Sequence, residues 1–85
     1  MKETIIAAAI RYEGLVCALP RPARHHHVIK ALSEVPNIRI PVDKEQGFVT
    51  STGRFVGRDK AAEIALASGQ LRFLNRSWLA SEDLW

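Results

Sequence analysis

The first constraint on the fold comes from residues 4–20. Two apolar and partly β-branched runs, residues 4–11 and 15–19, flank the pair Glu13-Gly14, whose glycine can adopt a positive φ. Pro20 ends the second run, because proline has no backbone N–H to donate to a neighbouring strand. This pattern predicts a β-hairpin, and with it an antiparallel sheet.

Two helices are expected to pack on this sheet. In residues 22–34, apolar side chains repeat with the i, i+3, i+4, i+7 spacing of one buried stripe, and Pro36 ends the segment. The side chains of this stripe are Val28, Ala31, Leu32 and Val35. Asp59 is placed to cap the second helix, which is expected to end at about residue 68, before Gly69.

The remaining segments complete the predicted order. Short strands are expected at residues 48–50 and 54–56, around a turn at 51–53, and a last strand at 71–79, after which Ser81 caps a final turn. Residues 36–46 are expected to form a connector, with a short extended piece at 38–42. The order β-β-α-β-β-α-β predicts an α+β fold, a small antiparallel sheet with two helices, as a single domain over residues 1–85.

Composition narrows the possible functions. A chain of 85 residues buries only about 60–65% of its unfolded surface, which favours a partner subunit, and the net charge of +3 favours anionic partners. The single Cys17 excludes an intrachain disulfide and a multi-cysteine zinc site, and it favours a reducing compartment. No apolar run reaches the ~20 residues that a membrane span needs. We therefore predict a cytoplasmic protein with no membrane partner and no cofactor.

Three consecutive histidines, residues 25–27, stand at the start of the first predicted helix. Adjacent helical side chains point in different directions and cannot converge on one ion, so we predict no metal site. Arg24 and His25 flank the buried stripe, whereas His26 points toward solvent. They are either ordinary polar residues of a basic turn or part of a phosphate seat at the helix N-terminus. If His25 binds as the imidazolium, affinity falls as pH rises through about 6.5–7.5.

A second basic group, Arg54 and Arg58, lies in the run GRFVGR. The helix dipole disfavours a cation at a helix N-terminus, and a bound anion would relieve this at Arg58. The predicted ligand-binding residues are Arg24, His25, Arg54 and Arg58 for phosphates, with Phe48 or Trp85 stacking on a base. The competing interpretation makes Phe48, Phe55 and Phe73 core residues and leaves Arg58 in solvent. No catalytic residue is predicted.

The runs GFVTSTGRFVGRDKAAEIALASGQ and SEDLW, with ETIIAAAIRYEG and RHHHVI upstream, resemble small bacteriophage-encoded proteins. They are similar in particular to the Thoeris anti-defence sponge family of the first type, from about residue 5 to residue 85. The resemblance implies a phage protein that sequesters cyclic nucleotide signals of Thoeris or CBASS defence without cleaving them. These signals are cyclic ADP-ribose isomers or cyclic oligonucleotides. It also implies a homo-oligomer, dimeric or higher, in an infected bacterial cell.

Other classes stay open. A small nucleotide-processing hydrolase would use His25 or His27 as its base, since catalytic residues need no local motif. A nucleic-acid-binding module is disfavoured by the net charge of only +3. An assembly module would bury the aromatic and leucine side chains near the C-terminus, which are Trp78, Leu79, Leu84 and Trp85. A binding protein is favoured over an enzyme.

Overall fold

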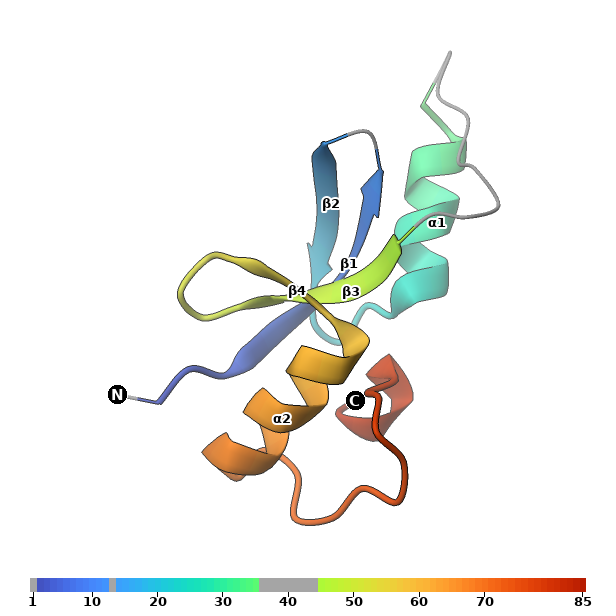
Figure 1. Ribbon diagram of the computed structural model, residues 1–85. Helices are drawn as coiled ribbons and strands as arrows, with labels where there is room; N and C mark the ends of the chain where they lie inside the picture. Colours follow the sequence, from blue (N-terminus) through green and yellow to red (C-terminus); the bar gives the residue numbers. More distant parts are fainter. Residues whose placement is uncertain (1, 13, 36–44) are drawn as a thin grey trace.

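The structure is a computed structural model that describes residues 2–12, 14–35 and 45–85. In chain order its elements are β1 (Ile5–Tyr12), β2 (Leu15–Pro20), α1 (His25–Ser33), β3 (Glu45–Thr50), β4 (Phe55–Gly57), α2 (Arg58–Ser68) and the short 3-10 helix η1 (Ser81–Asp83). Figure 1 shows α1 beside the β1–β2 hairpin and α2 below β3 and β4. The predicted α+β fold is confirmed, while the extended piece expected at residues 38–42 lies outside the described residues.

Within the described residues, four strands form one antiparallel sheet in the order β2-β1-β3-β4. Ala8 on β1 pairs with Leu19 on one side and with Phe48 on the other, and Phe48 in turn pairs with Val56. Directly paired side chains point to the same face of a sheet, and so does Ile10, two residues after Ala8. These apolar residues therefore form one continuous face.

Both helices cover this face. α1 packs Val28 and Leu32 onto Ile10, and α2 packs its small alanines closely against Phe48. The buried residues around α2 are Ile5, Ala8, Phe48, Val56, Ala61, Ala62, Ile64, Ala65 and Leu79. The predicted stripe on the first helix is only half correct, because Ala31 and Val35 are exposed. The helix ends at Ser33, its buried residues are the i, i+4 pair Val28 and Leu32, and Ile29 packs beside them.

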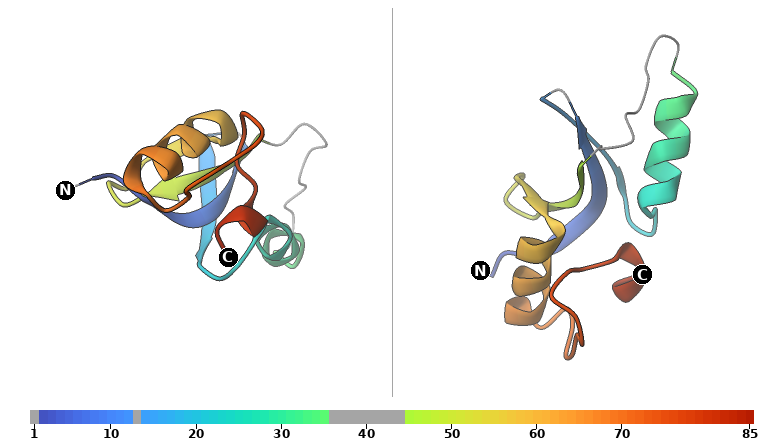
Figure 2. Two further views of the ribbon diagram at one scale, coloured as in Figure 1. Left: turned by 90° about the horizontal axis from the view of Figure 1, so that it is seen from below. Right: turned by 45° about the vertical axis from the view of Figure 1, so that its right-hand side comes forward.

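The strand expected at residues 71–79 is absent from the structure. After Gly69, which takes a left-handed φ of 83°, the chain passes around α2 as an irregular segment and reaches η1 beside α1 (Figures 1 and 2). Leu71, Leu74 and Leu79 pack against the core at spacings of three and five, which does not match the period of two that a strand needs. Phe73 is 74% exposed, so its assignment to the core is wrong.

Gln70 takes the place of a missing strand partner. β2 ends at Pro20, which pairs with Ala7, so Ile5 lies beyond the end of β2. The Gln70 side-chain oxygen accepts the Ile5 N–H at 2.6 Å, and its amide nitrogen donates to the Ile5 carbonyl at 2.8 Å. One side-chain amide thereby satisfies both backbone groups of a fully buried residue.

Candidate functional site

The three histidines occupy three different environments at the start of α1. His25 Nε2 lies 2.7 Å from the Gly47 carbonyl oxygen, and the ring packs edge-on against Phe48 with centroids 4.9 Å apart. A carbonyl only accepts, so Nε2 carries the proton and donates. His27 Nδ1 accepts the Arg24 N–H at 2.8 Å and thereby caps the helix, while His26 is exposed. The helix begins at residue 25 rather than 22, because residues 21 and 22 form a turn.

A surface hollow of about 350 Å³ lies where the two helices begin. His25 is the first residue of α1, and Arg58 is the first residue of α2. Both line the hollow together with His26, Ile29, Gln46, Trp78, Ala80 and Glu82. A helix N-terminus carries about half a positive charge and has N–H groups without partners in the helix. The fold therefore brings two such ends to one hollow. η1 lies near the first turn of α1 (Figure 2) and contributes Glu82 to the lining.

Arginine and tryptophan side chains form one wall of the hollow. Arg58 Cζ lies 5.0 Å from the centroid of the Trp78 ring, and Arg76 Cζ lies 4.5 Å from the same ring. Trp78 is still 40% exposed. The ion pairs of the described residues include Arg76, which contacts Asp83, but not Arg58. Arg58 is thus an exposed cation at the edge of an aromatic surface.

The environment of His25 favours its neutral form. Burial lowers its pKa below the ordinary value, and the charge of Arg58 lowers it further. The Gly47 carbonyl and the charge of Glu82 act in the opposite direction, but they do not reverse the shift. This lowered pKa disfavours the imidazolium, while the Nε2–H bond to Gly47 leaves Nδ1 as the atom that would take up a proton. Phosphate binding by the imidazolium stays a prediction.

Arg24 and Trp85 do not line the hollow but hold one of its walls in place. Arg24 Nε donates to the main-chain oxygen of Trp85 at 2.7 Å, and Trp85 Nε1 donates to the Ala23 carbonyl at 2.8 Å. We call this reciprocal contact of Ala23, Arg24 and Trp85 the C-terminal latch. It fixes η1, and with it Glu82, beside the start of α1.

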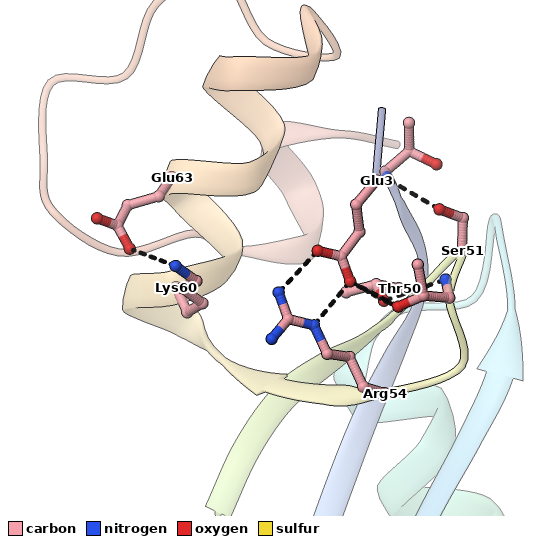
Figure 3. A network of polar contacts seen from close by, with 8 residues as sticks. Glu3, Thr50, Ser51, Arg54, Lys60 and Glu63 are labelled. Carbon is pink, nitrogen blue, oxygen red and sulfur yellow. Dashed lines mark hydrogen bonds and ion pairs between the residues drawn. The ribbon is translucent and has the colours of Figure 1, made fainter. Parts of the chain in front are cut away.

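The other two predicted residues lie away from the hollow. Phe48 is fully buried beneath His25, so a base cannot stack on it without opening the core. Arg54 binds the Glu3 carboxylate through Nε and Nη2, both at 2.7 Å, and Thr50 and Thr52 donate to the same carboxylate (Figure 3). These bonds lower the pKa of Glu3 to about 2. The network anchors the N-terminal segment to the β3–β4 turn.

Sequence reasoning missed Gln46, Trp78 and Glu82 as residues of the hollow. Trp78 and Glu82 come from the irregular C-terminal part of the chain, where no periodicity shows which way a side chain points. The one available signal was their position in the run from Trp78 to Trp85, which is rich in aromatic and acidic residues. From the sequence, Trp78 is expected at an interface, and Trp85 either there or stacked on a base of the ligand.

Neither a metal cluster nor a spanning helix appears in the part of the chain that the structure describes. Over residues 2–12, 14–35 and 45–85, no group of three or more His, Cys, Asp and Glu side chains is arranged to hold a metal ion. No helix within these same ranges has the length and apolar character needed to cross a bilayer.

The fold and the hollow define a class: a small α+β domain whose two helices begin at one surface hollow lined by charged and aromatic residues. The family model described as Phage T4 y16D protein matches residues 4–85, so the chain belongs to this phage protein family. Comparisons with curated proteins and with solved structures found no match. The predicted phage origin is therefore confirmed.

Proposed function

We propose that the hollow binds one nucleotide unit of a cyclic nucleotide, and that the protein sequesters this immune signal without cleaving it in the cytoplasm of an infected bacterium. The observation that carries this proposal is the exposed Arg58 guanidinium stacked beside Trp78 where both helices begin. The resemblance to the Thoeris anti-defence sponges supports the same class of ligand. This makes the protein a phage anti-defence protein that acts by binding.

Each part of a nucleotide has a matching group in the hollow. Arg58 supplies a permanent positive charge for a phosphate, and the first turns of the two helices add their positive ends. The exposed part of Trp78 and the ring of His26 offer aromatic surface for a base. The Gln46 side chain adds hydrogen-bonding groups to the hollow. In this proposal Arg58 keeps its predicted role, Trp78 takes the stacking role predicted for Phe48 or Trp85, and Arg54 has no part in the site.

The size of the hollow bears on oligomeric state. Its volume of about 350 Å³ is near the lower end of the roughly 300–1,000 Å³ typical of small-molecule sites. One nucleotide unit suits such a volume, and the rest of a cyclic oligonucleotide would extend beyond it. We therefore include a homo-oligomer in the proposal, in which a second copy contacts the remainder of the ligand.

Calorimetry with defined probes tests the proposal. Cyclic ADP-ribose isomers, 3′,3′-cyclic di-AMP, cyclic tri-AMP and linear ADP-ribose are titrated into the protein, and the bound ligand is released by heat and weighed by mass spectrometry. Recovery of an intact cyclic probe supports sequestration. Recovery of a cleaved product instead supports the hydrolase, for which the presence of His25, one of its two predicted bases, beside Glu82 in one hollow is the favouring observation.

Arg58→Ala examines the site itself. A charge-assisted contact with phosphate contributes about 1.5–3 kcal/mol, so the variant should bind roughly ten- to a hundredfold more weakly. Arg72→Ala is the matched control, because Arg72 is also exposed but does not line the hollow. Equal affinities of Arg58→Ala and wild type, or an equal loss in Arg72→Ala, would place the ligand elsewhere. Circular dichroism of both variants checks that they fold.

A further inference from the structure

The hollow contains a carboxylate as well as a cation. Glu82 lines it together with Arg58, and both charges act on His25, whose pKa Arg58 lowers and Glu82 raises. Glu82 is exposed, and the ion pairs within residues 2–12, 14–35 and 45–85 do not include it. Its carboxylate accepts one long hydrogen bond, from Ser81 Oγ at 3.3 Å.

The position of Glu82 is fixed by its neighbours. Asp83 accepts the Ala80 N–H at 2.8 Å and pairs with Arg76, which holds the first turn of η1. The C-terminal latch then ties the end of η1 to the residues before α1. Glu82 lies between these two attachments. Its backbone is therefore held beside the hollow from both sides, and its side chain lines the hollow.

A carboxylate in the lining limits what the hollow can accept. It repels a bare anion, and at neutral pH it accepts hydrogen bonds but does not donate them. A ligand that satisfies both Arg58 and Glu82 must carry a negative charge and, a few ångströms away, a hydrogen-bond donor. In a nucleotide, the ribose hydroxyls are the donors nearest to the phosphate. Acidic side chains bind ribose hydroxyls in this way in dinucleotide-binding folds.

We propose that Glu82 accepts a hydrogen bond from the ribose 2′-hydroxyl of the bound nucleotide and makes the hollow selective for ribonucleotides over 2′-deoxyribonucleotides. This inference rests on the proposed function, because it assigns a specificity-determining residue to the same hollow. Glu82 contributes selectivity, and Arg58 contributes the attraction for phosphate. A free phosphate satisfies only Arg58.

A paired set of ligands and variants tests this assignment by calorimetry. The probes are 3′,3′-cyclic di-AMP and its bis-2′-deoxy analogue. Wild-type protein should bind the ribose probe about ten- to a hundredfold more tightly, the range expected for a hydrogen bond to a charged group. Glu82→Ala should bind both probes alike. Glu82→Gln, which keeps a neutral acceptor, should retain only a two- to tenfold preference. Glu34→Gln, a charge-matched change at an exposed residue outside the hollow, should behave as wild type.

The outcomes separate the two proposals. Equal binding of both probes by wild-type protein overturns the role of Glu82 and leaves the proposed function standing. The same follows if Glu82→Ala keeps the full preference, because the discrimination then comes from another group or from sugar conformation. If neither probe binds wild-type protein, both proposals fall for this class of ligand.

Discussion

Replacing Gln70 with alanine should remove a strand partner without touching the hollow. The substitution deletes two hydrogen bonds to Ile5, measured at 2.6 and 2.8 Å. Each contributes about 0.5–1.5 kcal/mol, and Ile5 is fully buried, so its N–H and C=O are left without an easy replacement. We expect the free energy of unfolding to fall by about 2 kcal/mol. For a domain of this size, that lowers Tm by roughly 8–16 °C.

Urea unfolding followed by circular dichroism measures this loss, and amide hydrogen exchange locates it at Ile5. Gln70→Glu keeps the acceptor for the Ile5 N–H but turns a carboxylate toward the Ile5 carbonyl, so it should be at least as destabilising. Gln46→Ala is the control, because no hydrogen bond of the Gln46 side chain is found within the described residues. If Gln70→Ala stays within about 0.5 kcal/mol of wild type, the side chain does not act as a strand partner.

Two further changes probe the ends of the described chain. Trp85→Phe keeps an aromatic ring but removes the hydrogen-bond donor to the Ala23 carbonyl. The variant should lose about 0.5–1.5 kcal/mol of unfolding free energy and bind cyclic nucleotides more weakly. Unfolding and calorimetric curves equal to those of wild type would contradict the role of the C-terminal latch. Glu3 has a folded-state pKa of about 2 against an ordinary value of 4.5, so its contribution is complete above about pH 4.5 and is lost as pH falls toward 2. In Arg54→Ala, the free energy of unfolding should depend less on pH between about pH 2 and 6. If its dependence on pH equals that of wild type, the Glu3 network does not stabilise the fold.

The elements with local signals could be predicted from the sequence. The hairpin, both helices and the end of α2 at Gly69 depend on residues close together in the chain, and each appears in the structure. The strand predicted at residues 71–79 is wrong. The leucines of this segment pack against the core, but their spacing does not match the period of a strand. No local pattern indicates that the Gln70 side chain bonds the backbone of Ile5, 65 residues earlier, in place of a neighbouring strand.

The candidate site was predictable only in part. His25 and Arg58 could be found, because a helix start fixes where its first residues point. Arg54 could not be excluded from the sequence, since its partner Glu3 lies 51 residues away. Trp78 and Glu82 depend on the path of an irregular segment, which long-range packing determines.

The C-terminal latch also sets the order in which the protein can finish folding. Its two bonds join residues 61 and 62 positions apart, so loop closure must bring together distant parts of the chain. A ribosome makes the residues before α1 early and Trp85 late. The β1–β2 hairpin and α1 can form on the nascent chain, but the wall that carries Glu82 cannot dock until Trp85 has been synthesised. The hollow is thus completed only after the sheet that supports it has formed.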